Sequence, residues 1–329
     1  MDTTYSAVTL VSSMRLVILA LLASTTFTGS AFGWGCEGHQ MVALIARAHL
    51  SPATSAEVDR LLRENPIDPS LNRFCKDRPE DLMADSATWA DDARQIEKTA
   101  DWHFIDIPIA VPANPAHEAQ LMQWCKPSDG KPGCIVSAIE YERKILADRA
   151  RSGPDRAKAL RYIIHFIGDL SQPLHASDNH DRGGNCTAIY FFSPDKPDNL
   201  HAIWDYRIVA KELADRNATQ QQYAAVVDKD FSGRWSDWGA SRADVTAWTW
   251  DSHALAISVS YGDLKPQIPV ASASAGLADQ AACDAGRASV EPLHISIGKD
   301  YTNAALPVIR EQLAKAGYRL AGLLNDILK

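Results

Sequence analysis

The sequence lacks several features that would place it in common functional classes. It has no Cys-x-x-Cys pair, which argues against a dithiol redox centre and against a thiolate zinc finger. It has no internal repeat or low-complexity tract, so nothing in its 329 residues requires a second domain. Positive charge is not in excess, and the formal net charge of -8 argues against a broad basic surface for nucleic acid. A local positive site built from metal ions is compatible with this charge.

The sequence also has no apolar run long enough to span a bilayer. The short run Leu16–Ala23 follows Arg15 and precedes a small and polar stretch that ends at Ala31-Phe32-Gly33. A charged segment, a short apolar segment and a small-x-small site are typical of a secretory signal peptide. We therefore expect residues 1–33 to be cleaved before Trp34, and the mature protein to be secreted or periplasmic without a membrane anchor.

Trp34 would be the first residue of the mature chain. A free α-amine and its own carbonyl can chelate a metal in a five-membered ring, and His39 is close enough in sequence to add a ligand. A packing anchor is the alternative interpretation of this tryptophan, but the cleavage site and the histidine beside it favour the metal. Trp34 and His39 are therefore candidate ligands.

Cysteines are few, but their number is even. Export makes disulfides the expected state of all six: Cys36, Cys75, Cys125, Cys134, Cys186 and Cys283. Cys125 and Cys134 bracket a loop rich in turn residues, so we expect a local bridge between them. The sequence does not fix the other pairings.

Helical periodicity covers most of residues 34–329, which we expect to form a single all-α domain, allowing for a short β-hairpin. Helices are expected over residues 40–49, 55–63, 80–96, 135–151, 155–170, 199–213, 220–235, 241–260 and 301–328. Residues 188–192 could form a short strand. The stretch 263–292 is poor in periodicity and rich in Ala, Ser and Pro, and we predict a surface loop or insertion there.

Two histidines have an aspartate at the fourth position after them. His165 and Asp169 share one face of an expected helix, and His201 and Asp205 repeat the spacing. His175 lies between the pairs. An imidazole and a carboxylate aimed at one point suit a borderline cation such as zinc. One such pair could be chance or a capping contact, but two pairs with a histidine between them indicate metal.

Other histidines and aspartates stand in similar settings. With the Trp34 terminus and the two pairs, they make nine candidate ligands, which is enough for three zinc ions at three or four ligands each: Trp34, His39, Asp91, His103, His165, Asp169, His175, His201 and Asp205. We give no role to the remaining histidines, which we expect to be solvated or structural.

The order of these motifs resembles the zinc-dependent, single-strand-specific nucleases of the S1/P1 type, relatives of bacterial zinc phospholipase C. The resemblance runs from Trp34 to the C-terminus without residues 263–292. Its motifs are Trp34-Gly with His39, Trp89-Ala-Asp91, His103-Phe-Ile-Asp106, His165-Phe-Ile-Gly-Asp169, Gln172-Pro-Leu-His175, Asp181-Arg-Gly-Gly-Asn185, Asn199-Leu-His201-Ala-Ile-Trp-Asp205 and the closing 316–325.

The resemblance implies a ligand set for each of three zinc ions, with Asp169 bridging the first two. The first set is Asp91, His103, His165 and Asp169; the second is Trp34, His39 and Asp169; the third is His175, His201 and Asp205. It also implies hydrolysis of single-stranded DNA and RNA to 5′-phosphate products, with 3′-nucleotidase activity at the same site, and we expect a monomer.

Four further residues are candidates for contact with the substrate. Arg94, one helical turn from Asp91, could stabilise charge on phosphoryl oxygens, or form a surface salt bridge. Phe104 follows a candidate ligand and could stack on an exposed base, or belong to the core. The resemblance implies that Asp106 and Asn185 form hydrogen bonds to the base or the nucleophile.

Two other functions remain open. A zinc phospholipase C shares the ligand framework, so the ligands alone do not separate it from a nuclease, although Phe104, Asp106 and the 181–185 motif favour nucleic acid. An exported metal-binding protein without catalysis is the second alternative. Structural zinc sites usually close with thiolate or imidazole and do not cluster in threes, which favours the enzyme.

Overall fold

Helix α7 (Gly153–Ser171) is the element around which the protein is built. The computed structural model describes Met1 and residues 34–114, 118–239 and 244–329, so the expected signal peptide lies outside the described residues. Ser152 caps α7 by accepting a hydrogen bond from the Asp155 amide, and Pro154 lies in its first turn, where no amide donor is needed. From Ala159 onwards every residue of α7 is buried, which makes it the centre of the core.

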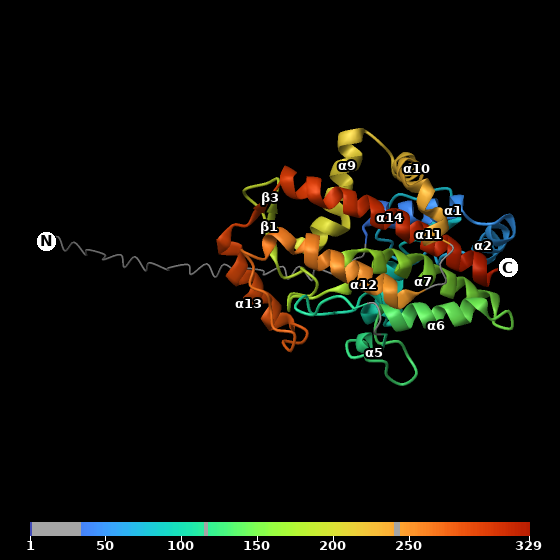
Figure 1. Ribbon diagram of the computed structural model, residues 1–329, viewed down its shortest axis with the longest axis horizontal. Helices are drawn as coiled ribbons and strands as arrows, with labels where there is room; N and C mark the ends of the chain where they lie inside the picture. Colours follow the sequence, from blue (N-terminus) through green and yellow to red (C-terminus); the bar gives the residue numbers. More distant parts are fainter. Residues whose placement is uncertain (2–33, 115–117, 240–243) are drawn as a thin grey trace. The chain divides into compact units, whose positions relative to one another are not determined.

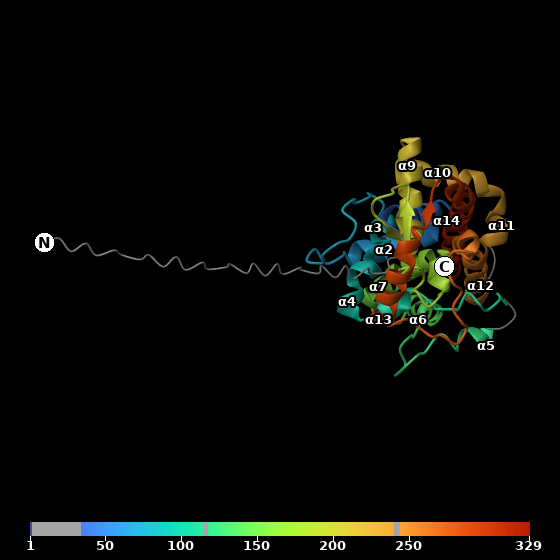
Figure 2. The same cartoon turned by 90° about the vertical axis from the view of Figure 1, so that its left-hand side faces the viewer.

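Other helices pack around α7 and bury most of it. Figures 1 and 2 show α6 on one side of it and α14 on the other, and both helices pack against it. The helices in contact with α7 are α1 (Cys36–Ala48), α2 (Pro52–Glu64), α3 (Leu82–Ser86), α4 (Trp89–Glu97), α6 (Ile135–Ala147), α12 (Val245–Leu255) and α14 (Lys299–Ile327). Their apolar side chains form one continuous core, which confirms the predicted mainly helical fold.

The remaining helices are short or peripheral. They are α5 (Glu118–Leu121), α8 (Leu200–Ala202), α9 (Ile208–Arg216), α10 (Gln220–Phe231), α11 (Trp235–Trp238) and α13 (Gln280–Val290). A π-helical segment, Ile203–Arg207, joins α8 to α9, and a 3-10 turn, Ala100–His103, follows α4. None of the helices in the described ranges is both long and apolar enough to cross a membrane.

The helix predicted over residues 80–96 is broken into α3 and α4. Asp81 caps α3, and the helix ends at Ser86 before α4 begins at Trp89. The break frees the carbonyl oxygen of Ala87, which lies 2.8 Å from Nδ1 of His165. The sequence pattern did not reveal this break, because both halves continue with helix-forming residues.

A three-stranded sheet lies at the edge of the helical body. Its order is β2-β1-β3, with β1 (Ala188–Phe191) antiparallel to β2 (Asp198–Asn199) and parallel to β3 (Ser296–Ile297). Ala188 pairs with Asn199, and Tyr190 pairs with Ser296. The predicted strand and hairpin are therefore confirmed, and β3 adds a strand that the sequence did not indicate.

Residues 263–292 are not only a loop, as predicted, because they contain helix α13. Asp279 caps this helix by accepting a hydrogen bond from the Ala282 amide. Val290 is its one buried residue, so the helix contributes little to the core. A covalent bond, Cys186–Cys283, attaches it to the body of the protein.

All six cysteines are paired. The bridges are Cys36–Cys75, Cys125–Cys134 and Cys186–Cys283, so the predicted local bridge is confirmed. The first attaches the loop before α3 to the start of α1, close to Trp34. Full pairing fits folding in an oxidising compartment.

Candidate metal centre

Three groups of buried side chains could each hold a metal ion. Within each group, one ligand atom from every residue lies within 4.8 Å of the others. We name them the His39 group (His39, His165, Asp169), the Asp91 group (Asp91, His103, His165) and the His201 group (His175, His201, Asp205). The eight histidines and aspartates predicted as ligands therefore all come together.

Asp169 lies between the first two groups, and its two oxygens face different partners. Oδ2 is 3.0 Å from Nε2 of His165 and 3.0 Å from Nδ1 of His103. Oδ1 is 3.3 Å from Nε2 of His39, whose ring stacks on that of His165. Since a carboxylate with its oxygens turned to separate ligand groups can bind one ion through each, the geometry fits the bridge by Asp169 that the family resemblance implied.

Gly168 allows this close approach of α1 to α7. A Cβ atom on Gly168 would lie 2.7 Å from Nδ1 of His39, so a larger residue would push the imidazole away from Asp169. This glycine belongs to the His165-Phe-Ile-Gly-Asp169 motif, but no role was predicted for it. Its place immediately before a candidate ligand on a buried helix was the available signal.

Asp91 and His103 enter from the other side of α7. Asp91 lies in the first turn of α4, and its carboxylate is 3.7 Å from Nδ1 of His103 and 3.8 Å from Nε2 of His165. These gaps are too long for hydrogen bonds. A tetrahedral zinc with bonds of about 2.0 Å sets its ligand atoms about 3.3 Å apart, so the spacing of the groups suits a shared ion.

The His201 group is built on a different part of the chain. Nε2 of His201 is 3.2 Å from Oδ2 of Asp205 and 3.1 Å from Nε2 of His175. His201 lies on α8 and Asp205 in the π-helical segment that follows it. His175 lies in the 3-10 turn after α7, which brings the third group next to the other two.

Backbone carbonyls orient three of the imidazoles. The Nδ1 atom of His165 lies 2.8 Å from the carbonyl oxygen of Ala87. The Nδ1 atoms of His175 and His201 each lie 2.7 Å from a carbonyl oxygen, that of His103 and that of Gly183 respectively. Each carbonyl can only accept a hydrogen bond, so Nδ1 carries the proton and Nε2 presents its lone pair to the group.

Gln172 orients the third group in the same way. Its Nε2 donates to Oδ1 of Asp205 at 2.5 Å, and its Oε1 accepts from the Leu174 amide at 2.6 Å. It is buried and precedes His175 by three residues. Gln172 belongs to the Gln-Pro-Leu-His motif, but no function was predicted for it.

Burial and the neighbouring carboxylates shift the pKa values of the histidines in the centre in opposite directions. Burial and the neighbouring His165 lower the pKa of His39 to about 3, and burial likewise lowers the pKa of His103 to about 4. Burial alone would lower the pKa of His165, but the carboxylates of Asp169 and Asp91 outweigh it and raise that pKa to about 9. Buried carboxylates thus draw positive charge into the centre, as a cation site requires.

Several polar atoms of the centre have no hydrogen-bond partner among the described residues. They are both ring nitrogens of His39, Nε2 of His103, Oδ1 of Asp91 and Oδ1 of Asp169. Each such buried atom costs on the order of 1–3 kcal/mol of stability if it stays unsatisfied. Imidazole nitrogens and carboxylate oxygens left in this way are the donors that zinc binds, so the residues present fit the predicted ions.

Trp34 is fully buried beside this centre. The amide of the next residue, Gly35, donates to the carbonyl oxygen of Asp205 at 2.8 Å. Trp34 also packs closely against α1, because a Cβ atom added to Gly38 would lie 2.6 Å from the Cβ atom of Trp34. The predicted start of the mature chain is therefore in contact with the segment that carries the His201 group.

The predicted substrate-contact residues differ in their burial and contacts. Arg94 is buried, with Nη1 3.8 Å from Oδ1 of Asp91, so the surface interpretation of its salt bridge is wrong. Phe104 and Asp106 are half-buried. Burial of the carboxyl group, followed by the charge of Asp178, raises the pKa of Asp106 well above its usual range.

Asn185 lies in a loop, residues 178–187, that we call the site loop. Asp178 accepts hydrogen bonds from the amides of Asp181 and Gly183, and Asp181 accepts from the Gly184 amide and the Tyr261 hydroxyl. Gly183 has a φ of +60°, and a Cβ there would lie 2.6 Å from Leu174 O. The sequence indicated the glycines, but the role of the two aspartates and of Tyr261 depends on contacts across the fold.

The comparisons with known proteins agree with this geometry. The family model for "S1/P1 Nuclease" matches residues 34–329. The chain is 29% identical over 303 residues to Endonuclease 2 of Arabidopsis thaliana, covering 90% of each chain. It is 28% identical over 307 residues to Nuclease S1 of Aspergillus oryzae, covering 90% of this chain and 92% of the relative. It is 27% identical over 309 residues to Nuclease P1 of Penicillium citrinum, covering 89% and 97%.

Proposed function

We propose that this chain, which belongs to the S1/P1 nuclease family, is an exported zinc-dependent endonuclease that hydrolyses single-stranded DNA and RNA to 5′-phosphate products. The same site would act as a 3′-nucleotidase. The observation that carries the proposal is the convergence of three His/Asp groups around Asp169, inside a chain that matches the family from Trp34 onwards.

Three zinc ions would occupy the centre. The Asp91 group with Asp169 would hold one ion, and the His39 group with the amine and carbonyl of Trp34 would hold the second. The His201 group would hold the third. Zinc bound there would make hydroxide available near neutral pH and would stabilise charge on phosphate oxygens.

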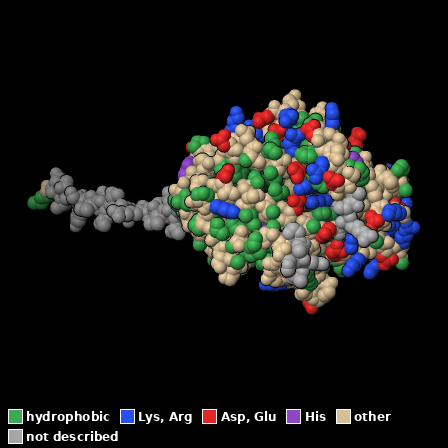
Figure 3. Space-filling model, in the orientation of Figure 1, with side chains coloured by type: hydrophobic (Ala, Val, Ile, Leu, Met, Phe, Trp, Pro, Cys, Tyr) green, Lys and Arg blue, Asp and Glu red, His purple; other side chains and the backbone are tan. Residues whose placement is uncertain are grey.

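The charge of such a centre would attract a phosphodiester to an acidic protein. Three dications against the carboxylates of Asp91, Asp169 and Asp205 leave a formal excess of about three positive charges. Lys and Arg side chains are interspersed with Asp and Glu on the face shown in Figure 3. Attraction would therefore be concentrated at the metal centre rather than spread over a basic surface.

Protein side chains would supply the remaining interactions. The Arg94 guanidinium, buried beside Asp91, would donate hydrogen bonds to phosphoryl oxygens as their charge increases. Phe104 would stack on a base, which favours single strands because a duplex hides its base faces. Asp106 and Asn185 would form hydrogen bonds to the base or to the attacking water.

Export would follow from the N-terminal segment. Residues 1–33 have the order of a signal peptide, and the three disulfides fit an oxidising destination. Cleavage before Trp34 would create the amine that the His39 group needs. Residues 34–329 would then act as a monomeric, single-domain enzyme.

A substrate panel tests the proposal. The purified mature protein is assayed on single-stranded DNA, duplex DNA, RNA, 3′-AMP and phosphatidylcholine, before and after chelation and with zinc restored. We expect cleavage of the single strands and of 3′-AMP, weak cleavage of the duplex, and loss of activity on chelation. Activity on phosphatidylcholine with none on denatured DNA would make the protein a phospholipase C, and no activity on any of them would leave a metal-binding protein.

A further inference from the structure

Arg182, at the tip of the site loop, is held in an unusual way. Its Nε donates to Ala278 O at 3.1 Å and its Nη1 donates to Oε1 of Gln280 at 3.0 Å. Both acceptors are neutral and belong to the 263–292 insertion. Gln280 is itself oriented, because its Nε2 donates to Oδ1 of Asp284 at 2.9 Å. The guanidinium is thus fixed in place while its positive charge stays uncompensated.

Two other exposed arginines of this protein are paired with carboxylates. Arg207 pairs with Asp198, and Arg216 pairs with Glu212. Within the described ranges, Arg182 forms no ion pair, and its bonds go to a backbone carbonyl and an amide. Of the nearby acids, Asp181 turns inward to Tyr261 and Asp279 caps α13.

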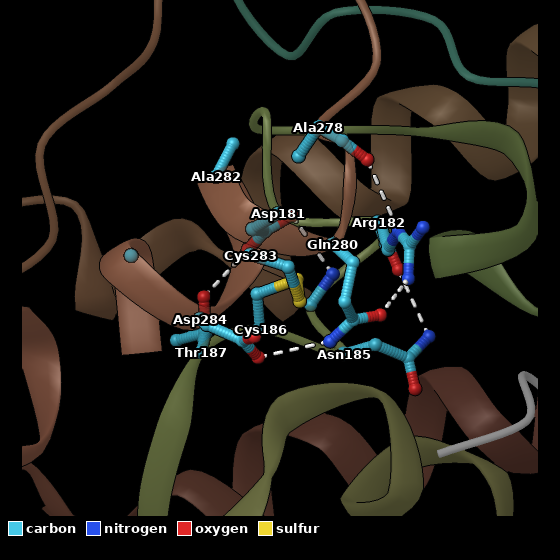
Figure 4. Close-up of a disulfide and its surroundings, with 12 residues drawn as sticks. Asp181, Arg182, Asn185, Cys186, Thr187, Ala278, Gln280, Ala282, Cys283 and Asp284 are labelled. Atoms are coloured by element: carbon cyan, nitrogen blue, oxygen red, sulfur yellow. Dashed lines mark hydrogen bonds between the residues drawn. A yellow bond between two sulfur atoms is a disulfide. The ribbon is translucent and has the colours of Figure 1, made fainter. Parts of the chain in front are cut away.

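The insertion and the disulfide fix this arrangement in space. Cys186–Cys283 joins the site loop to α13, and the Asn179 side chain donates to Pro269 O at 3.0 Å. Figure 4 shows the side chains of Arg182 and Asn185 on one side of the loop, with Thr187 and the disulfide on the other. An arginine immobilised in advance loses little further conformational entropy when it binds an anion.

The site loop also connects Arg182 to the metal centre. The Asn185 side chain donates to Arg182 O at 2.9 Å, and Gly183 O accepts the hydrogen bond that orients His201. Arg182 is therefore the residue before Gly183, whose carbonyl orients a member of the His201 group. It does not belong to that group, because its guanidinium contacts only the insertion.

We propose that Arg182, positioned by Gln280 and the insertion, binds the phosphate of a nucleotide next to the one being cleaved. This inference rests on the proposed nuclease function. A guanidinium recognises phosphate through directional hydrogen bonds and charge. A 3′-mononucleotide has no neighbouring phosphate, so Arg182 would favour polynucleotides over mononucleotides at a single catalytic centre.

The first test compares two substrates in the Arg182→Gln variant. Specificity, kcat/KM, is measured on a single-stranded oligonucleotide and on 3′-AMP over a range of salt concentrations. We expect kcat/KM on the oligonucleotide, divided by kcat/KM on 3′-AMP, to fall about tenfold, which is the effect of losing one charged hydrogen-bonded contact. The salt dependence on the oligonucleotide should become shallower by about 0.7 in log–log slope. Arg216→Gln, which removes the same charge from an exposed and paired arginine, is the matched control and should leave the ratio unchanged.

A second variant separates charge from loop structure. Gln280→Glu keeps the size and the acceptor but places a carboxylate against Arg182, which should neutralise it and lower the same ratio. A purely structural Arg182 would be held more firmly by this change, and the ratio would not fall. Equal losses on both substrates in Arg182→Gln, or a fall in neither variant, overturns the inference. Lack of cleavage of both substrates by the unmodified protein would instead reject the proposed function.

Discussion

The His39 and Asp91 groups share His165, and the Asp169 carboxylate contacts both of them, whereas the His201 group shares no residue with either. The first two are built around one buried helix, and both oxygens of a single carboxylate serve them. The third is built on α8, the π-helical segment and the turn after α7, and the site loop and Gln172 orient it. The His39 and Asp91 groups are therefore coupled through Asp169, and the His201 group is separable from them. The coupled pair and the third group should respond differently to mutation.

The largest effect is expected from breaking the shared carboxylate. Asp169→Asn keeps the size of the side chain but removes the charge that the His39 and Asp91 groups both use. We expect the loss of about two of three zinc ions and a fall in kcat/KM on the order of 10³-fold or more. Zinc content, activity and circular dichroism are measured together, and a mild effect with full zinc content would contradict the bridge.

A smaller effect is expected from the separable group. His201→Ala should remove one zinc ion and lower kcat/KM on the order of 10²-fold, because the coupled pair keeps all of its ligands. Metal analysis of the purified variant checks this. If His201→Ala emptied the whole centre, the independence of the third group would be disproved.

The N-terminus provides a finer test within the coupled pair. One extra residue before Trp34 removes the α-amine from the proposed chelate and leaves His39 and Asp169 in place. We expect weaker binding of one zinc ion and a loss of activity between about 10-fold and 100-fold. Mass spectrometry confirms the terminus, and full activity of the extended protein would show that the amine is not a ligand.

The smallest effect concerns a buried carboxylate far from the metal groups. Glu142 on α6 is buried, and that burial raises its pKa from 4.5 to about 7 although Lys158 opposes the change. The unfolded chain ionises first as the pH rises, so Glu142 destabilises the fold progressively between pH 4.5 and pH 7.

Glu142→Gln should therefore raise the thermal midpoint by several degrees at pH 8, corresponding to at most about 3 kcal/mol, and by little at pH 4. Thermal melts at both pH values check the sign, with activity unaffected. A gain that is equal at the two pH values would mean that ionisation of Glu142 is not responsible. The contrast with Asp169 shows what a buried carboxylate does with and without a cation partner.

The predictable part of the molecule was the part set by local spacing. His165 and Asp169 could be paired from the sequence because one helical turn brings them together, and Cys125 and Cys134 because a short loop joins them. The break at Ala87, the contact of Gly168 with His39 and the bond from Gln172 to Asp205 could not be predicted. Each depends on a partner far along the chain, whose position is fixed only by packing.

The 263–292 insertion also could not be predicted fully, because long-range contacts hold it in place. Residues 263–292 are rich in Ala, Ser and Pro and poor in periodicity, which predicts a loop, and the helix they contain, α13, buries only Val290. The insertion is held in place by the disulfide from Cys283 to Cys186 and by its hydrogen bonds to Arg182 and Asn179. None of these interactions leaves a periodic trace in the sequence.

The zinc content of the purified protein, processed to begin at Trp34, tests the central claim most directly. The account predicts close to three zinc ions per chain by elemental analysis, two of them lost together in Asp169→Asn. One ion or none in the unmodified mature protein would contradict a shared centre built from these three groups.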